Sequence, residues 1–166
     1  MRFQTLFIAL AVGLANANTF HPFSLDPAAE IRNVLAHYCL ILDTKTYSDL
    51  SSVYTPDAIA NFTTIGLGVL SGLPAIQKAM NSSLFGIPTQ HAMTTSYISD
   101  IKKNEANIIT YYTLEQFGTG ERAGQLFTVW GKWEDQLVND GGWKVKNRQV
   151  VAMGGPLIGS FVVPSH

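Results

Sequence analysis

Residues 31–62 read IRNVLAHYCLILDTKTYSDLSSVYTPDAIANF, and this stretch decides the fold. Apolar side chains recur there at the spacing of one helical face, at Ile31, Val34, Leu35, Tyr38 and Leu42. Asp26 is a suitable cap and Pro27 suits a first helical turn, so the pattern predicts an amphipathic helix over residues 27–43. A second short helix over residues 47–54 and a strand over residues 58–63 are predicted to follow.

Asp43 closes the first predicted helix. The negative end of the helix dipole disfavours a carboxylate there by a few tenths of a kcal/mol, up to about 1 kcal/mol. The residue is therefore either a solvated acid at a helix exit or a group held at the rim of a cavity with a raised pKa. The residues alone leave both interpretations open.

The remaining chain changes from helical period to strand period. A third helix is predicted over residues 73–83, and after Pro88 the apolar pattern alternates with period two. Long strands are predicted over residues 89–102, 105–117, 125–137 and 143–151, joined by tight turns, with Gly154-Gly155-Pro156 ending the last. This order predicts an α+β fold, a cone-shaped α+β barrel of three N-terminal helices packed on a curved antiparallel sheet. The open end of such a cone is a natural pocket.

The chain of 166 residues suits one domain preceded by a targeting segment. A basic start, an apolar run over residues 6–15 and a small-x-small site predict a signal peptide over residues 1–17. A linker over residues 18–26, a domain over residues 27–155 and a C-terminal tail over residues 156–166 complete the organisation. We therefore expect a secreted protein or one in the lumen of the secretory pathway. Asn61 and Asn81 begin sequons and are candidate glycosylation sites.

Charge and cysteine content argue against several classes of function. The chain has 11 Lys and Arg against 12 Asp and Glu, without a basic run of five, so we expect no nucleic-acid partner. Beyond the first 17 residues no apolar segment is long enough to span a bilayer. Cys39 is the single cysteine, and its place beside the helical stripe favours a small buried hydrophobe over a nucleophile. The four histidines lack metal-ligand spacing, so no metal is expected, and no organic cofactor motif is present.

Three segments carry a family resemblance. They are residues 31–62, Gln90-His91 at the start of the first long strand, and Trp143-Lys144-Val145 after a glycine-rich turn. Together they resemble the SnoaL-like branch of the superfamily named after nuclear transport factor 2, which includes scytalone dehydratase and ketosteroid isomerase. The resemblance covers about residues 26–155 and implies a cone that works without a cofactor. It also implies a possible homodimer through the exposed sheet face.

The resemblance implies a catalytic pair. Asp43 and His91 match the acid and the histidine of the dehydratase-type pocket. Leu42 and Phe62 stand where the dehydratase has tyrosines, and the 117–118 region lacks its second histidine, so this chain is unlike scytalone dehydratase itself. An Asp and a His in one low-dielectric cavity suit proton transfer, because burial raises an Asp pKa and a neighbouring imidazolium lowers it. Enolisation, dehydration and ring closure all fit such a pair. For each residue the alternative is structural: a solvated helix-end carboxylate, or a strand histidine bonded to backbone.

Candidate substrate-binding residues come from the helix and the strands: Tyr38, Tyr54, Phe62, Tyr112, Trp130 and Arg148. On the second long strand the set Tyr112, Leu114 and Gln116 is favoured to face inward, whereas the opposite register would make Glu115 a third acid. Trp130 and Trp133 lie on opposite faces by their odd spacing. An inward Arg148 would orient a carboxylate or an enolate, and an outward one is equally compatible. Tyr38 and Tyr54 also fit as core aromatics.

These observations predict a cofactor-free lyase or isomerase of the SnoaL-like polyketide cyclase type. It would act as a cyclase, isomerase or dehydratase on a small apolar polyketide- or terpenoid-like intermediate of secondary-metabolite biosynthesis. Two alternatives stay open: a secreted, non-catalytic small-molecule-binding protein with the same cone, and a structural dimer module.

Overall fold

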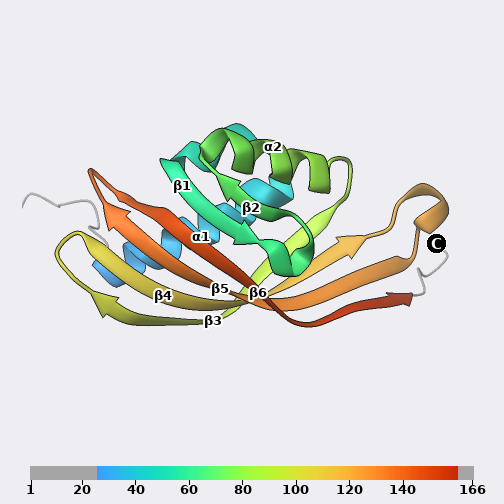
Figure 1. Ribbon diagram of the computed structural model, residues 1–166. Coiled ribbons are helices and arrows are strands. Elements are labelled where there is room, and N and C mark those ends of the chain that lie inside the picture. Colours follow the sequence, from blue (N-terminus) through green and yellow to red (C-terminus); the bar gives the residue numbers. More distant parts are fainter. Residues whose placement is uncertain (1–25, 161–166) are drawn as a thin grey trace, which may run out of the picture.

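The computed structural model describes residues 26–160, which form one curved six-stranded sheet with helices on its inner face (Figure 1). The order across the sheet is β2-β1-β6-β5-β4-β3. The strands are β1 (Tyr54–Phe62), β2 (Gly68–Ser71), β3 (Thr89–Ile101), β4 (Glu105–Phe117), β5 (Gln125–Asn139) and β6 (Trp143–Ser160). The predicted signal peptide and all of the predicted linker except Asp26 lie outside the described residues, so both stay predictions.

The first helix forms as its sequence predicts. α1 (Pro27–Thr44) begins where the Ala29 backbone N–H donates to Asp26 Oδ1 at 2.8 Å. The predicted stripe is buried apart from Val34, which is half-buried, and it faces the long strands. The helix ends at Lys45, whose backbone adopts the left-handed conformation.

The prediction of three N-terminal helices is only partly met. The third predicted helix is α2 (Leu73–Leu84), but the second is a six-residue 3₁₀ helix, η1 (Tyr47–Ser52). Its sequence, YSDLSS, explains the difference, because Ser and Asp side chains compete for backbone hydrogen bonds and disfavour an α-helix. Two further single-turn 3₁₀ helices are η2 (Thr63–Ile65) and η3 (Gly120–Arg122).

The sheet is mixed rather than purely antiparallel. The predicted hairpins are confirmed, since β3–β4, β4–β5 and β5–β6 pair antiparallel. β1, however, runs parallel to β6, with Ala60 opposite Arg148. A parallel pair needs a long crossover, and residues 63–142 provide it. The four-residue β2 was not predicted, and it pairs with the end of β1.

The last strand is longer than predicted. β6 continues through Gly154-Gly155-Pro156 to Ser160, so the prediction that these residues end it is wrong. The register shifts between Thr128 and Trp130 on the partner strand, and Gly155 adopts a φ of 87° that glycine tolerates. The bulge absorbs the irregular residues, and the ladder resumes beyond them. As Figure 1 shows, the ends of β4, β5 and β6 extend past the helices.

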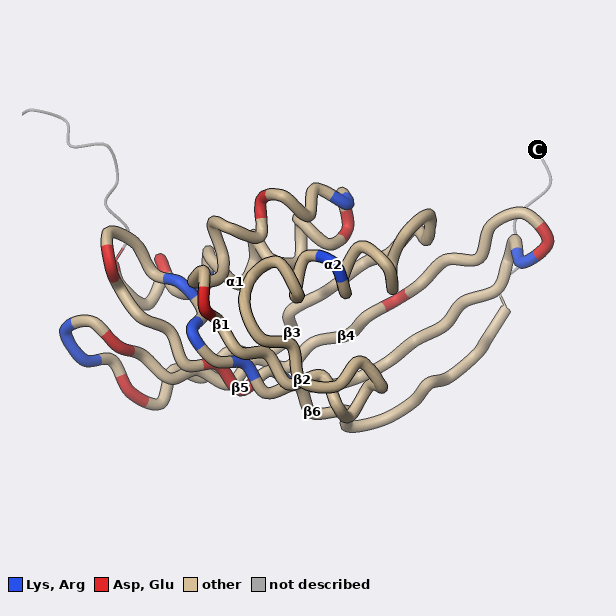
Figure 2. Tube along the Cα trace, turned by 45° about the horizontal axis from the view of Figure 1, so that its top comes forward, with Lys and Arg blue, Asp and Glu red and all other residues tan. Residues whose placement is uncertain are grey.

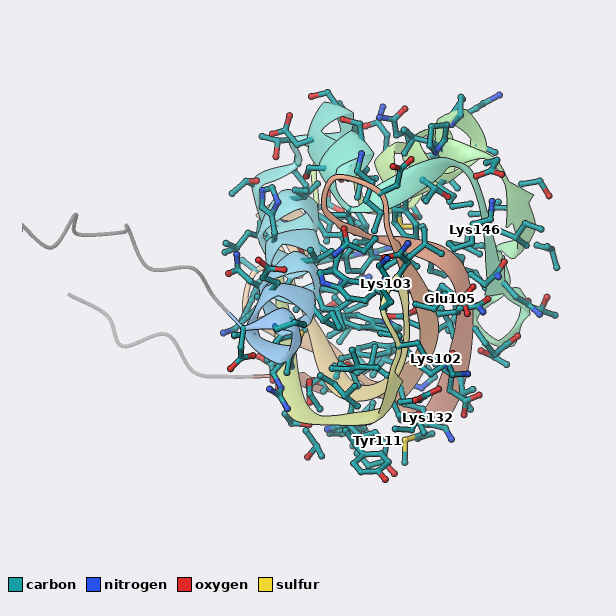
Figure 3. All side chains as sticks on the ribbon, turned by 90° about the vertical axis from the view of Figure 1, so that its left-hand side faces the viewer. Lys102, Lys103, Glu105, Tyr111, Lys132 and Lys146 are labelled. Atoms are coloured by element: carbon teal, nitrogen blue, oxygen red, sulfur yellow. The ribbon has the colours of Figure 1, made fainter. Side chains whose placement is uncertain are left out.

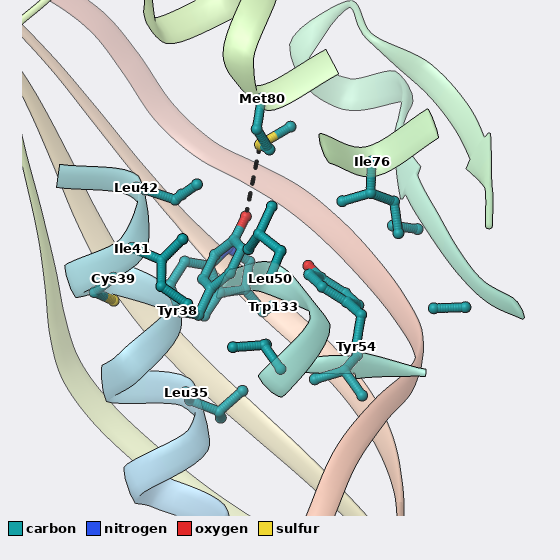
Figure 4. Close-up of a cluster of buried hydrophobic side chains, with 14 of the residues drawn as sticks. Leu35, Tyr38, Cys39, Ile41, Leu42, Leu50, Tyr54, Ile76, Met80 and Trp133 are labelled. Carbon is teal, nitrogen blue, oxygen red and sulfur yellow. Dashed lines mark hydrogen bonds between the residues drawn. The ribbon is translucent and has the colours of Figure 1, made fainter. Parts of the chain in front are cut away.

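Aromatic rings fill the centre of the core between α1 and the sheet (Figure 4). Tyr38 meets Trp133 edge to face at 5.2 Å between ring centroids, and Tyr112 stacks on Trp133 at 4.6 Å. Tyr112 lies across Gly131, where a Cβ would stand 2.6 Å from the tyrosine oxygen. The strand therefore needs glycine at that position to admit the ring.

Charged residues of both signs are mixed over the described chain and gather at hairpin ends and outer helix faces (Figure 2). The outer face of the sheet carries exposed aromatic side chains among its polar ones, and Figure 3 shows Tyr111 pointing away from the core. None of the helices within residues 26–160 is long and apolar enough to cross a membrane.

Candidate active site

Asp43 and His91 meet although 48 residues separate them in the chain. His91 Nδ1 lies 2.7 Å from Asp43 Oδ1, and the His91 backbone N–H donates to Asp43 Oδ2 at 2.9 Å. The Thr89 hydroxyl donates to Asp43 Oδ1 at 2.8 Å. The His91 side chain is 5 % exposed and the Asp43 side chain 23 %. The end of α1 and the start of β3 thus hold the carboxylate through three hydrogen bonds.

The geometry keeps Asp43 ionised. Burial alone raises the pKa of this carboxyl, but hydrogen bonds from the His91 side chain, the His91 backbone and Thr89 lower it overall. The interpretation of a cavity-rim acid with a raised pKa is therefore wrong. An ionised carboxylate only accepts hydrogen bonds, so His91 Nδ1 carries the proton of the shared bond. In the neutral ring, Nε2 is then the free lone pair on the edge away from Asp43.

His91 lines a chamber of about 60 Å³ between α1, α2 and the sheet. Its other walls are mainly apolar: Tyr38, Leu42, Phe62, Ile65, Leu67, Met80, Ser83, Leu84, Tyr112, Leu114, Trp133 and Val150. Of these, Tyr38, Phe62 and Tyr112 were candidate substrate-binding residues. Since Tyr112 and Leu114 line the chamber, the favoured register of β4 is the observed one, and Glu115 falls on the other face.

Two hydroxyl groups join His91 on the chamber wall. Tyr38 donates a weak hydrogen bond to the Met80 sulfur, 3.9 Å away (Figure 4). Ser83 donates to the Met80 carbonyl at 3.3 Å. Burial raises the pKa of Tyr38, although Arg148 lowers it in part, so the phenol stays protonated. A protonated phenol offers a hydrogen-bond donor to an oxygen atom of a substrate.

Three candidate substrate-binding residues do not line the chamber. Trp130 is 39 % exposed on the outer sheet face, and Trp133 takes the inward place. Tyr54 is fully buried behind Tyr38, with ring centroids 5.8 Å apart. The structure therefore does not place these two residues on the chamber wall, and a substrate contact at either of them stays a prediction. The odd spacing predicted that the two tryptophans lie on opposite faces of the sheet, but it could not tell which of them faces inward.

Arg148 points inward, but its guanidinium is already bound to Asp135. Its Nε and Nη2 donate to the two oxygens of Asp135 at 2.7 and 2.8 Å, and both side chains are fully buried. The guanidinium lies 4.2 Å from the Tyr38 ring centroid and 4.5 Å from that of Trp133. It therefore supports two chamber walls from behind and does not itself line the chamber, and a role in orienting a substrate carboxylate or enolate stays a prediction.

Sequence reasoning missed the residues that surround the dyad. Thr89 and His91 are two apart on one strand, so their side chains share a face. This spacing was the available signal for Thr89. Lys45 Nζ donates to Thr89 Oγ1 at 2.8 Å, and no sequence pattern linked these two residues.

A second cavity of about 490 Å³ lies where the ends of β4, β5 and β6 extend past the helices. It is lined by Ile87, Gln116, Phe117, Gly118, Thr119, Arg122, Gln125, Leu126, Phe127 and Ile158. Gln116 lies two residues after Leu114 on β4, so its side chain is on the sheet face that lines the chamber. Ile87 likewise follows Leu84 of the chamber wall.

The remaining sequence predictions concern Cys39, metal binding and glycosylation. Cys39 is buried and free, and burial raises the pKa of its thiol to about 12, so it behaves as a small hydrophobe. Residues 26–160 contain no group of three or more His, Cys, Asp or Glu that could hold a metal ion. Asn81 is exposed on α2, whereas Asn61 is half-buried and its oxygen accepts from the Thr63 backbone N–H at 3.0 Å. Glycosylation of both stays a prediction.

Residues 24–149 match the model of the SnoaL-like domain, which spans most of the chain. The chain belongs to the SnoaL-like domain family. An uncharacterized protein of Mycobacterium tuberculosis is similar to this chain in sequence. It is 25 % identical over 121 residues, which cover 72 % of this chain and 80 % of that protein.

Solved structures share this SnoaL-like fold. A candidate scytalone dehydratase from Novosphingobium aromaticivorans superposes with a TM-score of 0.67 at 21 % identity, covering 82 % of this chain and 88 % of that one. The hexachlorocyclohexane dehydrochlorinase LinA-type3 from Novosphingobium barchaimii gives 0.69 at 18 % identity, covering 83 % and 94 %. At these identities the likeness shows the fold alone. The match to the family model confirms the SnoaL-like resemblance drawn from the sequence.

Proposed function

We propose that this SnoaL-like protein is a cofactor-free acid/base enzyme in which His91 Nε2 moves a proton of the substrate. One observation carries the proposal: an ionised carboxylate holds His91 Nδ1 at 2.7 Å, and the same imidazole lines an apolar chamber. Metal-free general bases of this kind contribute roughly 10²–10⁴-fold to a rate. Asp43 acts through the imidazole, so we assign it the positioning role and His91 the transfer.

The proton path has two halves. Nε2 removes a proton from a carbon acid of the substrate, and the negative Asp43 stabilises the imidazolium that forms. The imidazolium then returns the proton to one of three acceptors. Return to another carbon gives isomerisation, and return to a departing hydroxide gives water and a double bond. Return to the alkoxide oxygen that forms when the carbanion attacks a carbonyl carbon of the same substrate gives cyclisation. The Tyr38 hydroxyl is placed on the same wall to donate a hydrogen bond to an enolate oxygen.

Cavity sizes constrain the substrate. Sites for small organic molecules usually measure about 300–1,000 Å³, well above the 60 Å³ of the chamber. The chamber thus holds only the reacting end of a substrate, next to His91. The rest would extend along the same sheet face into the larger groove, whose walls are apolar apart from Gln, Thr and Arg side chains. An elongated, largely apolar polyketide- or terpenoid-like intermediate fits this arrangement and belongs to the proposal, as do secretion and a role in secondary-metabolite biosynthesis.

The test begins with proton exchange, which needs no knowledge of the natural product. The protein is incubated in D₂O with a panel of elongated apolar ketones and β-hydroxy ketones, and deuterium uptake and dehydration are followed by mass spectrometry. We expect His91→Gln to lower the rate by roughly 10²-fold or more, because the Gln amide offers no general base. The matched control is His37→Gln, at an exposed position of α1, which should leave the rate unchanged.

Equal rates in the wild type and in His91→Gln would refute the enzyme. Tight binding of panel compounds without exchange in the wild type would instead favour a non-catalytic binding protein with the same chamber. Both outcomes can be read from one set of samples.

The outer sheet face supports a proposal about assembly. Tyr97, Tyr111, Trp130 and Met153 are exposed there by 39–63 %. Residues paired across neighbouring strands share a face, and Thr95–Tyr111 and Thr113–Trp130 are such pairs. We propose a homodimer through this face. Sedimentation at micromolar concentration tests it, and a monomer there would refute it.

A further inference from the structure

Lys45 occupies an unusual backbone position directly after α1. Its φ of 64° and ψ of 22° are left-handed, and within residues 26–160 it is the only non-glycine residue with a positive φ. Glycine is the usual residue at such a helix end, because a Cβ is disfavoured in this conformation. A lysine kept at a strained position next to a candidate active site calls for a role of its side chain.

The side chain reaches the catalytic pair through one intermediary. Lys45 Nζ donates to Thr89 Oγ1 at 2.8 Å, and the Thr89 hydroxyl donates to Asp43 Oδ1 at 2.8 Å. The same Oδ1 atom faces His91 Nδ1 at 2.7 Å. An ammonium has no acceptor and a hydroxyl has one proton, so the direction of this chain is fixed from Lys45 to Asp43. The left-handed turn is what brings the lysine back toward the end of the helix it terminates.

We propose that Lys45 is a positioning residue that, through Thr89, locks Asp43 Oδ1 toward His91 and keeps the carboxylate ionised at lower pH than the pair alone would. This inference rests on the proposed acid/base function. It adds a positively charged third residue to the Asp43–His91 pair, and it predicts that Lys45 helps to set the lower pH limit of activity.

The other titratable groups around Asp43 and His91 are neutral, paired with each other or on the opposite sheet face, so Lys45 is the cation that acts on Asp43. Around Asp43 and His91, the Cys39 thiol and the Tyr112 phenol are neutral, since burial raises the pKa of each to about 12. Tyr38 is a protonated phenol, as described above. The charges of Arg148 and Asp135 are paired with each other behind the chamber wall. Glu115, opposite Gln90, lies on the other sheet face.

The electrostatic support is reciprocal. Burial lowers the pKa of Lys45, and the negative charge of Asp43 raises it in part. Lys45 Nζ and Asp43 Oδ1 are joined through Thr89 Oγ1 by two hydrogen bonds of 2.8 Å each, so the two charges lie less than about 6 Å apart. At such a distance two unit charges change each other's pKa by roughly 0.5–1 pH unit at effective dielectric constants of about 40–80. Removing the Lys45 charge should therefore raise the pKa of Asp43 by about that amount.

The experiment compares Lys45→Met, Lys45→Gln and Lys45→Gly in the full chain. ¹³C NMR follows the titration of the Asp43 carboxyl in the free protein, and the pH–rate profile follows turnover on an active panel compound. We expect both the Asp43 pKa and the acidic limb of the profile to rise by about 0.5–1 pH unit in all three variants. Lys45→Gly relieves the backbone strain, so it should unfold at higher urea than Lys45→Met while showing the same shift. Lys78→Gln, at an exposed site on α2, is the control and should shift neither.

An unchanged Asp43 pKa in a folded Lys45→Met or Lys45→Gly protein would overturn the inference. A shifted Asp43 pKa in a wild-type protein without turnover would support the relay and remove the proposed function alone. If Lys45→Met changed only stability while the pH profile stayed in place, Lys45 would be structural and the proposal would fail.

Discussion

Substitution of Asp43 by asparagine tests the dyad with the smallest change of shape. The carboxylate accepts from His91 Nδ1, from the His91 backbone and from the Thr89 hydroxyl. An amide has one acceptor oxygen, and its NH₂ group can only donate. If the oxygen keeps the backbone bond, the NH₂ faces Nδ1, and the neutral imidazole must carry its proton on Nε2. The lone pair that faces the chamber is then lost.

The expected magnitudes follow from these contacts. A hydrogen bond to a charged group contributes about 1.5–3 kcal/mol and a neutral one about 0.5–1.5 kcal/mol. The Asp43→Asn substitution should therefore lower the free energy of unfolding by about 1–2 kcal/mol. We expect the lower end of this range because the Asp43 side chain is 23 % exposed. The effect on the reaction should be larger than the effect on stability, because the base is lost: turnover should fall by roughly 10²-fold or more.

Urea denaturation and deuterium exchange on one preparation measure the two effects together. Asp49→Asn, an exposed carboxylate on η1, is the control and should change neither. Turnover of Asp43→Asn within about threefold of the wild type would refute the assignment, because a ring with the wrong tautomer cannot act as the base.

Three further outcomes follow from the same structure. Gly131→Ala should cost about 1–3 kcal/mol in urea denaturation, since the new Cβ would overlap the Tyr112 ring; an unchanged midpoint would contradict that packing. Between pH 5 and pH 3 the wild type should lose more stability than Asp43→Asn. The lowered pKa of Asp43 stabilises the fold above the unfolded Asp pKa of about 3.9, and this contribution fades as pH falls through the folded value; parallel pH–stability curves would exclude it. Arg148→Met should cost about 3–5 kcal/mol by leaving Asp135 buried and unpaired, and Arg148→Met with Asp135→Leu should recover much of it; a double variant no more stable than the single would contradict the pairing.

Local patterns were enough to predict the elements that carry the dyad. The helical stripe and its cap placed Asp43 at a helix end, and the period-two alternation placed His91 at a strand start. The inward face of β4 also followed from alternation. The family resemblance then joined two residues that no spacing rule connects.

Long-range geometry was beyond those patterns. The parallel pairing of β1 with β6 depends on how the crossover folds back, and the extension of β6 depends on a bulge in its partner strand. The inward direction of Arg148 was an open alternative, but its capture by Asp135 depends on a cross-strand pair. The left-handed backbone of Lys45 has no signal in the residue type, because glycine is what a helix end of this kind favours.

The most direct test of the central claim is to determine which nitrogen of the neutral His91 ring carries the proton. ¹⁵N NMR of histidine-labelled protein, assigned by comparison with His91→Gln and recorded where the ring is neutral, distinguishes the two tautomers. The geometry predicts a proton on Nδ1, bound to Asp43, and a bare Nε2 lone pair in the chamber. A proton on Nε2 would contradict the account, since the chamber would then contain no base.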